Sequence, residues 1–428
     1  MHVNASYQFA VSLVQQRRYS EAAPLLSQIC GTGSADLTSW VMLGLCLLGL
    51  NKTAQLMGLI ELRHRQANDG MKLLNDCLLM AQQWPDRTPV RRMIDQIPEN
   101  SALVVIGRYV SGLMHAQDGE VDRGLAQVIE AARLTGVLPE ELAREPYVKT
   151  IAVEGALLGS FADVARFAAE SPSRLFTKLG VQPEATFVGC VAHDPTEPCV
   201  FLSSCDERYL DRFGETVVRA LDATGARTIY HLHVVDPSPL LGDKIARLQR
   251  LCSGLALRYS TEVYAGKDDG YTRAEYYACS RLIRLPEIME HYERDIFMWD
   301  VDMNGIRDLR ALLGAMEGFD LGYFHMSNTR LTLAAHLATA YFSNTEAMRQ
   351  CAGVIRNYIL AKWATSPFWL LDQAAVYCSS QYLAAGTPSF RIRDFGVAPG
   401  GAFCEHIDVA SSAEEKQRMR KVAGKQAA

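Results

Sequence analysis

Hydrophobic positions in the first part of the chain follow the spacing of helices. The segments Tyr7–Val14 and Arg18–Leu26 place apolar residues three or four positions apart, with a polar break between them. A similar stretch covers roughly Pro146–Ala169, whereas Trp84–Arg92 carries two prolines and interrupts the pattern. The pattern therefore predicts an all-helical domain in the first part of the sequence.

These helical segments recur with a period of about 34 residues. Trp40, Leu43 and Gly44 form the pattern W-x-x-L-G, in which small side chains let paired helices approach closely. The corresponding positions are Ser6, Phe9, Ala10 and Leu13 one period earlier, Arg108, Ser111, Gly112 and His115 two periods later, and Ala22, Gly124 and Ala131 on second helices. The register resembles that of tetratricopeptide repeats, with a degenerate unit near Leu74–Pro89. The alternative is a helical domain whose periodicity is accidental.

Further along the chain, short apolar runs alternate with helical patterns. The expected strands are 198–204, 228–235, 256–264 and 296–299, and the expected helices are 210–221, a segment ending at 251, and 276–292. Such a series predicts an α/β domain with a mainly parallel central sheet, whose ligands bind outside the carboxyl ends of the strands. We therefore expect a helical repeat domain at 1–180, an α/β domain at 181–410 and a polar tail at 411–428.

The composition is that of an ordinary soluble protein, with 49% hydrophobic and 21% charged residues. The net charge of −5 does not favour nucleic-acid binding. The first twenty residues lack the pattern of a signal peptide, and no apolar run is long enough to span a membrane. The 11 cysteines include no C-x-x-C pair, which is typical of reduced thiols, so a cytoplasmic location is expected.

The candidate chemistry gathers at the end of Ile296–Trp299, an apolar run typical of a strand buried on both faces. Asp300 and Asp302 follow it, and on an extended backbone both point to one side while Val301 faces the other. Paired carboxylates suit Mn²⁺ or Mg²⁺, which takes further ligands from water and a substrate diphosphate. The alternative is that the aspartates cap a helix expected at Ile306–Leu313. The sequence contains neither a dinucleotide-binding fingerprint nor a P-loop.

The order of these motifs resembles that of the GT-A nucleotide-sugar glycosyltransferases, of the glycogenin and lipopolysaccharide galactosyltransferase type. The residues that carry the resemblance are Ser203–Tyr209, Arg281, Trp299–Met303 and Arg307–Leu309, within a match over roughly Pro198–His406. The resemblance implies a GT-A type α/β domain, hexosyl transfer from a nucleotide-diphosphate sugar with a preference for uridine, and Mn²⁺ or Mg²⁺ as cofactor.

The resemblance also implies which residues bind the donor. Ser204, Asp206 and Tyr209 would contact the nucleotide, the last two at its base. Arg281 would reach the phosphates, whose geometry a guanidinium matches. The structural alternatives are a helix cap for Asp206, a core position for Tyr209, and an ion pair of Arg281 with Glu275 or Asp295.

The metal site implied by the resemblance has three protein ligands. Asp300 and Asp302 would bind the ion, and Asp300 would also contact the donor. The histidine motif that supplies the third ligand in the family is absent from this sequence. His406, which follows two glycines, is the best substitute, and His325 is the second choice.

The residues facing the sugar and the acceptor depart further from the family pattern. Asp372 and Gln373 match its late Asp-Gln pair, with a polar helix turn as the structural alternative. In place of the family's Asn-Ser-Gly the chain has Tyr341–Thr345, in which Asn344 is the candidate. Whether transfer retains or inverts the sugar configuration is left open by these departures.

These features predict a metal-dependent glycosyltransferase. Helical repeats form extended concave surfaces, so a protein or peptide acceptor is favoured over a saccharide or a lipid-linked glycan. A catalytically inactive repeat scaffold is the alternative from another class. A phosphatase or nucleotidyltransferase would need further acidic ligands near the paired aspartates, which the sequence does not show.

Overall fold

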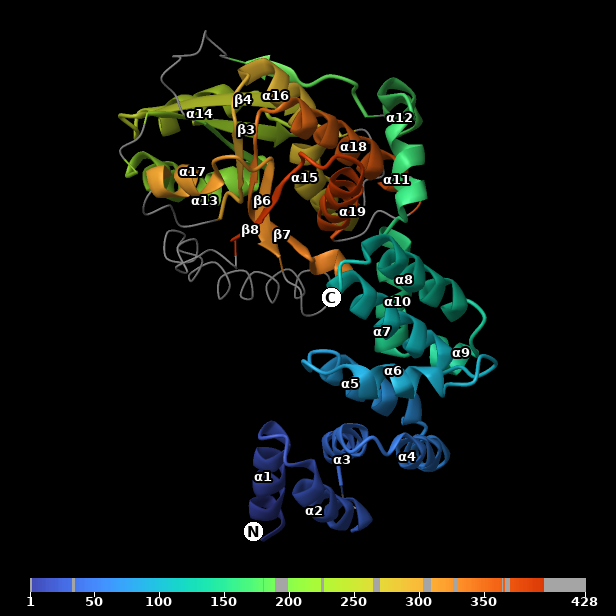
Figure 1. The fold of residues 1–428 in the computed structure, drawn as a ribbon. Coiled ribbons are helices and arrows are strands. Elements are labelled where there is room, and N and C mark those ends of the chain that lie inside the picture. Colours follow the sequence, from blue (N-terminus) through green and yellow to red (C-terminus); the bar gives the residue numbers. More distant parts are fainter. Residues whose placement is uncertain are drawn as a thin grey trace. The chain divides into compact units, whose positions relative to one another are not determined.

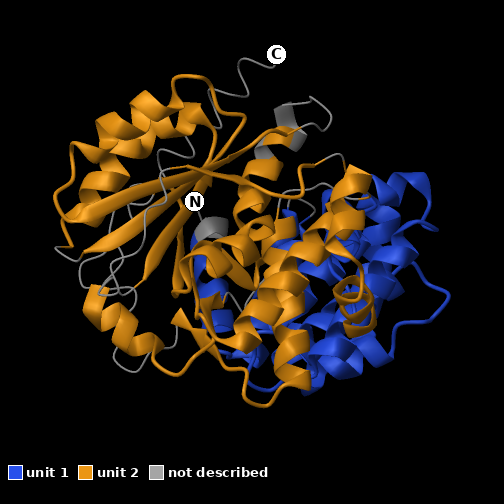
Figure 2. Ribbon diagram, turned by 90° about the horizontal axis from the view of Figure 1, so that it is seen from above, with its two compact units in different colours: residues 1–160, 328–330 blue, residues 161–327, 331–428 orange. Residues whose placement is uncertain are grey.

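The computed structural model describes residues 2–32, 35–179, 181–188, 199–224, 227–264, 270–302, 309–325, 330–363, 365 and 370–395. The chain divides into two compact units, residues 1–160 with 328–330, and residues 161–327 with 331–428. Figure 2 shows the two units in different colours. None of the helices in the described ranges is both long and apolar enough to cross a membrane.

The first unit consists of helices, as the hydrophobic pattern predicts (Figure 1). They are α1 (His2–Gln15), α2 (Tyr19–Gly31), α3 (Leu37–Gly49), α4 (Thr53–Ala67), α5 (Gly70–Ala81), α6 (Thr88–Asp95), α7 (Val104–Gln117), α8 (Val121–Thr135), α9 (Glu140–Ala143) and α10 (Pro146–Leu157). The first helices of successive pairs begin at residues 2, 37, 70 and 104, and the second helices at 19, 53, 88 and 121. Helix pairs therefore recur at close to the spacing that the sequence predicts.

Glycines at the helix crossings explain how these pairs pack closely. A Cβ atom added to Gly112 on α7 would lie 2.8 Å from the carbonyl oxygen of Gly124 on α8, and one added to Gly124 would lie 2.6 Å from the Gly112 oxygen. On α3, a Cβ atom added to Gly44 would lie 2.5 Å from Cys77 Sγ. Larger side chains at these three positions would force the helices apart.

The second unit is built on an eight-stranded sheet with the order β1-β4-β3-β2-β5-β7-β6-β8. Its elements are α11 (Phe161–Ala168), α12 (Pro172–Leu179), β1 (Thr186–Val188), β2 (Val200–Cys205), α13 (Glu207–Asp222), β3 (Thr228–Val235), α14 (Leu241–Gln249), β4 (Leu255–Glu262), α15 (Gly270–Ile283), α16 (Leu285–Tyr292), β5 (Ile296–Trp299), α17 (Leu309–Met316), β6 (Leu321–His325), η1 (Leu331–Leu333), β7 (Ala335–Phe342), α18 (Glu346–Trp363), α19 (Leu371–Gly386) and β8 (Ile392–Asp394). Strands β4, β3, β2 and β5 are parallel, as expected. However, β7 runs antiparallel to both of its neighbours and β1 antiparallel to β4, so the sheet is mixed.

Helices cover both faces of the sheet (Figure 1). On one face, α13, α14 and α17 pack on an apolar cluster that includes Phe201, Val217 and Leu312. Because side chains alternate along a strand, Ser204 on β2 faces the opposite side from Phe201, where it meets Ser280 of α15. α15 packs on β2 and β3, and α19 packs on β7.

The helices α11 and α12 belong to the second unit, which begins at Phe161 rather than near residue 180. The Phe167 ring packs edge-to-face against Tyr358 of α18, with ring centroids 5.2 Å apart. Asn357 Nδ2 donates to the carbonyl oxygens of Phe167 (3.2 Å) and Glu170 (3.0 Å), so it binds the end of α11. The composition changes near residue 180, but α11 and α12 pack against α18, which follows much later in the sequence.

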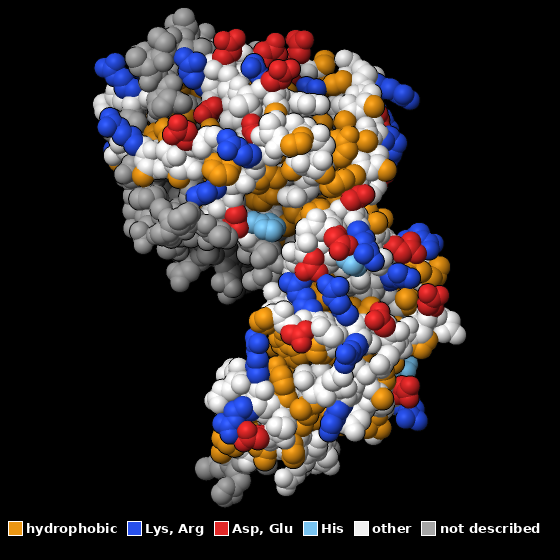
Figure 3. All heavy atoms as spheres, in the orientation of Figure 1, with side chains coloured by type: hydrophobic (Ala, Val, Ile, Leu, Met, Phe, Trp, Pro, Cys, Tyr) orange, Lys and Arg blue, Asp and Glu red, His pale blue; other side chains and the backbone are white. Residues whose placement is uncertain are grey.

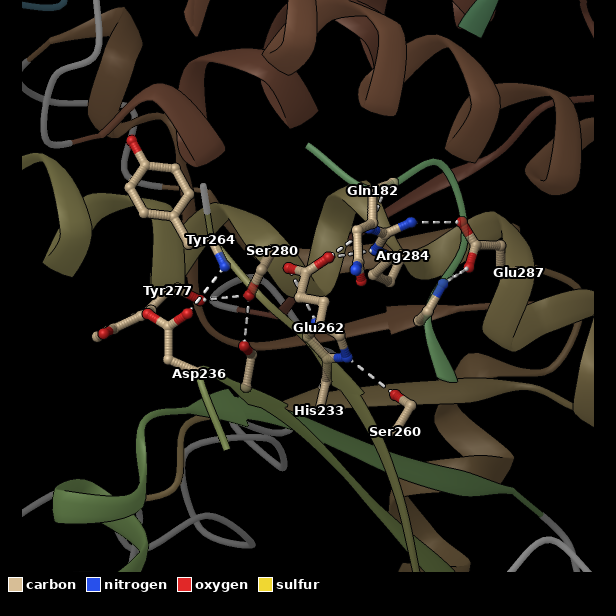
Figure 4. Close-up of polar contacts among 12 residues, drawn as sticks. Gln182, His233, Asp236, Ser260, Glu262, Tyr264, Tyr277, Ser280, Arg284 and Glu287 are labelled. Carbon is tan, nitrogen blue, oxygen red and sulfur yellow. Dashed lines mark hydrogen bonds and ion pairs between the residues drawn. The ribbon is translucent and has the colours of Figure 1, made fainter. Parts of the chain in front are cut away.

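A buried polar network lies between the sheet and α15–α16 (Figure 4). Arg284, which is fully buried, donates from Nε to Glu262 Oε2 at the end of β4 (2.6 Å). It also donates to the carbonyl oxygens of Gln182 (2.6 Å) and Pro183 (3.0 Å), which precede β1. Arg284, the N-cap residue of α16, thus links the segment that precedes β1 to the end of β4.

Candidate functional site

The strand order creates a topological switch point between β2 and β5. From β2 the chain adds β3 and β4 on one side, and then returns to place β5 on the other side. The strands that the connections from β2 and β5 lead to, β3 and β6, therefore lie on opposite sides of this point in the sheet. In open α/β sheets, ligands bind in the crevice that this divergence creates. The predicted residues Asp206, Asp300 and Asp302 directly follow these two strands.

The alternation after Trp299 predicts that Asp300 and Val301 point to opposite faces of the sheet, and they do. Val301 joins the apolar cluster on the face of α13 and α17. Asp300 faces the other side, toward α15, and its amide donates to the Ala338 carbonyl oxygen of β7 (3.0 Å). Asp302 is only 9% exposed. The capping alternative depends on residues 303–308, which lie outside the described residues, and α17 begins only at Leu309.

Arg281 is the cation of this site. Its side chain is 6% exposed, and Nη1 lies 2.5 Å from Asp300 Oδ1. Nη2 donates to the Leu337 carbonyl oxygen of β7 (3.3 Å). Burial alone would lower the pKa of Arg281, but the nearby carboxylates of Asp300 and Asp372 outweigh it and raise that pKa. Arg281 therefore pairs inside the site with Asp300, not with Glu275 or Asp295 as in the structural alternative.

Asp372 is a second buried carboxylate beside this arginine. It lies in the first turn of α19, is 7% exposed, and accepts from the Gln373 amide (2.8 Å). Burial raises the pKa of Asp372 to about 6, with Asp300 adding to the rise and Arg281 opposing it. The preceding Leu370 has a φ of 81°, a strained conformation for leucine. The start of α19 thus places a buried carboxylate near Arg281 and Asp300.

The β2 side of the site combines a helix cap and a half-exposed aromatic ring. Asp206 Oδ1 accepts from the Tyr209 amide (2.8 Å), so Asp206 is the N-cap of α13. Tyr209 is 38% exposed and is not a core residue. Partial burial raises the pKa of the Tyr209 phenol, and the charges of Asp302 and Asp300 raise it further. Its ring therefore lies near both aspartates that follow β5.

Two residues of α15 at the site were missed by sequence reasoning. Ser280 Oγ lies 2.5 Å from Ser204 Oγ and donates to the Tyr277 carbonyl oxygen (3.0 Å). Burial raises the pKa of Tyr277 to about 12, and the charges of Asp236 and Asp206 contribute. Tyr277 thus lies between the ends of β2 and β3 (Figure 4). Their spacing in the sequence was the available signal. Ser280 and Arg281 follow Tyr277 by three and four residues, so the three residues share one face of α15.

Some predicted residues are not brought to the site. Asn344 follows β7, and its amide donates to Asp295 Oδ1 (2.7 Å) at the start of β5. Because β7 runs antiparallel to β5, Asn344 lies at the opposite end of the strands from Asp300. His325 ends β6, which like β5 runs antiparallel to β7, so it lies at the same edge of the sheet as Asp300. Its ring stacks against Tyr377 with centroids 6.4 Å apart. His406 lies outside the described residues.

The described part of the site fits a divalent cation only in part. Its donor set offers the oxygen ligands of Asp300 and Asp302, which suit a hard ion that keeps water and phosphate ligands. Arg281 is a cation in direct contact with one of these two aspartates, Asp300. Within the described ranges, no group of three or more His, Cys, Asp or Glu side chains forms a complete metal site.

Comparisons with known proteins leave the family open. No protein-family model matches the sequence, and no curated protein matches it. A solved structure of a bifunctional glycosyltransferase, WbbM, in its apo form is similar over 49% of this chain, with 16% sequence identity and a TM-score of 0.31. The match covers 40% of that chain. A TM-score this low supports no inference about this protein.

Proposed function

We propose that this protein is a divalent-cation-dependent glycosyltransferase that uses a nucleotide-diphosphate sugar. One observation carries the proposal. A pair of aspartates, Asp300 and Asp302, lies at the switch point of an α/β sheet with the buried Arg281 beside it. Carboxylates for a hard cation and a guanidinium for phosphates are the two kinds of group that a nucleoside diphosphate requires.

Each group has a distinct task in this reaction. Asp300 and Asp302 would hold Mn²⁺ or Mg²⁺, which as a Lewis acid stabilises charge on the leaving diphosphate. Arg281 would bind the same phosphates. Tyr209 offers a half-exposed ring beside the carboxylates, suited to stack on a uracil base, with Asp206 holding the first turn of α13 in place.

Asp372 and Gln373 are the residues that we assign to the sugar and the acceptor. They start α19 next to Arg281, and Asp372 is ionised above about pH 6. An ionised carboxylate in a buried site can orient sugar hydroxyl groups or accept a proton from an attacking hydroxyl group. Asn344, at the far end of β7, is not assigned a catalytic role.

The helical unit is proposed to hold the acceptor. Helix pairs that recur at near-constant spacing, with glycine at their crossings, support a tetratricopeptide-like array. Arrays of this kind bind extended protein segments along a concave surface. We therefore favour a protein or peptide acceptor over a free saccharide.

Calorimetric titration with uridine, guanosine and adenosine diphosphates, with and without Mn²⁺, tests the proposal. We expect Mn²⁺-dependent binding that is tightest for uridine diphosphate. Asp302→Asn should abolish that dependence, because it removes a charged metal ligand, whereas Asp243→Asn on the exposed part of α14 should not. Mn²⁺-independent hydrolysis of a nucleotide sugar by Asp302→Asn at the wild-type rate would refute the proposal. Absence of any nucleotide binding would favour the inactive scaffold.

A further inference from the structure

In the ligand-free site, the positive charge of Arg281 already lies against Asp300, one of the two candidate metal ligands. Arg281 Nη1 and Asp300 Oδ1 are 2.5 Å apart, in a pair whose arginine is almost fully buried. A charge-assisted bond to an almost fully buried guanidinium is strong, because little water competes with it. Asp300 is therefore neutralised by Arg281 before any other ligand arrives.

The guanidinium also has a donor that is not used. Asp372, a second buried carboxylate, is near enough for its charge to contribute to the raised pKa of Arg281. The Leu337 carbonyl oxygen holds Nη2, and Nε is buried without a hydrogen-bond partner among the described residues. An unused buried donor beside two anions indicates a group built to receive one more acceptor. Phosphate oxygens are acceptors that match this guanidinium geometry.

A divalent cation and Arg281 compete for the same carboxylate. A cation on Asp300 would lie within roughly 5 Å of the guanidinium, where like charges repel strongly in a partly buried site. Binding of the cation alone must therefore weaken or break the ion pair. A diphosphate removes this conflict, because its oxygens bind the cation and the guanidinium together.

We propose that Arg281 holds the place of the cation in the ligand-free site, and that a divalent cation binds Asp300 in exchange for the Arg281–Asp300 ion pair. The inference rests on the proposed function and adds a rule for the order of binding. The cation alone binds weakly, and the nucleoside diphosphate tightens its binding by taking over the released guanidinium. By linkage, the cation tightens nucleotide binding by the same factor.

Removal of Arg281 should then strengthen cation binding, although Arg281 belongs to the donor site. We would titrate the full-length protein with Mn²⁺ and follow free Mn²⁺ by electron paramagnetic resonance, with and without uridine diphosphate. Arg281→Gln should lower the Kd for Mn²⁺ alone by about tenfold or more, because the Arg281–Asp300 ion pair no longer has to break and the like charge of the guanidinium is gone. In this variant, uridine diphosphate should tighten Mn²⁺ binding by a smaller factor than in the wild type, because only the direct contact between phosphate and cation remains.

A matched control separates the exchange from a general change in charge. Arg212 on α13 is close enough to Tyr209 to lower its pKa, so Arg212→Gln removes an arginine charge from the same neighbourhood and leaves the Arg281–Asp300 pair in place. Its Kd for Mn²⁺ should change by less than about threefold, since a charge outside the pair acts through more solvent. An equal effect of both substitutions would overturn the exchange.

The remaining outcomes are also decisive. An unchanged Mn²⁺ affinity in Arg281→Gln overturns the exchange, while Mn²⁺-dependent nucleotide binding by the wild type would keep the proposed function. If the wild type binds neither ligand, both proposals fall. Should circular dichroism show that Arg281→Gln does not fold, Arg281→Lys takes its place. One ammonium cannot hold both Asp300 and Leu337, so the Kd of Arg281→Lys for Mn²⁺ should be lower than the wild-type value by about threefold or more. An unchanged Kd overturns the exchange.

Discussion

Replacing Arg284 by methionine should strongly destabilise the second unit. Arg284 and Glu262 both have fully buried side chains, so the substitution leaves a buried carboxylate without its arginine. Breaking one side of a buried ion pair typically costs about 3–5 kcal/mol. The carbonyl oxygens of Gln182 and Pro183 also lose their donor, but this segment can turn toward water, so we add nothing for them. We therefore expect a loss of about 4 kcal/mol in the free energy of unfolding.

The pH dependence of this loss follows from the pKa of Glu262. Burial alone would raise that pKa, but His233 and Arg284 outweigh burial and lower it below the ordinary value of 4.5. The stability supplied by Glu262 is thus present above pH 4.5 and is lost as the pH falls through the lowered pKa. In Arg284→Met the pKa of Glu262 rises. The difference in the free energy of unfolding between the variant and the wild type should therefore become smaller as the pH falls.

Urea unfolding followed by circular dichroism measures this effect, with the transition assigned by hydrogen exchange of peptides from β3 and β4. Glu290→Gln on the exposed side of α16 is the control, and should stay within about 0.5 kcal/mol of wild type. The double variant Arg284→Met/Glu262→Gln should recover part of the loss, because no buried charge remains unpaired. A loss below about 1 kcal/mol in Arg284→Met would refute the reasoning.

Two further predictions concern the helices. Gly112→Ala should destabilise the first unit by about 1–3 kcal/mol in thermal unfolding, because the added methyl group meets the Gly124 carbonyl. Gly58→Ala on α4, which has open space around it, should instead stabilise by up to about 1 kcal/mol, and equal effects would contradict the packing argument. A fragment beginning at Phe161 should be soluble and bind the donor nucleotide without acting on a protein acceptor. A fragment beginning at Gln182 should aggregate, because it exposes the α18 surface that α11 and α12 cover. If both fragments are soluble, the domain boundary lies near residue 180.

Two central strands could be predicted because every residue of these strands is buried, so each strand is a run of consecutive, mostly apolar residues. The strand at 228–235 is buried along its whole length and is rich in β-branched and aromatic residues, and the run Ile296–Trp299 is buried on both faces and is an unbroken apolar segment. The alternation after Trp299 likewise predicts that Val301 joins the core, which the structure confirms.

Strand direction and distant packing could not be predicted in this way. The hydrophobic pattern of β7 does not say that the strand runs antiparallel to β5, and this direction decides that Asn344 lies far from Asp300. The placement of α11 depends on Asn357 and Tyr358, which follow nearly two hundred residues later. Asp372 could be chosen only by resemblance, because its burial beside Arg281 is a tertiary property.

The central position of β2 also sets an order in which the molecule can fold. Ser203 of β2 donates to the carbonyl oxygen of Trp299, a residue 96 positions later, whereas β3 and β4 follow β2 closely. Loop closure costs more entropy for distant partners, so β2, β3 and β4 should associate before β5 joins them. During synthesis, Asp206 emerges first, Asp300 much later and Asp372 last. If the proposed donor nucleotide binds these residues, it can therefore stabilise only the finished domain and cannot assist the early steps of folding.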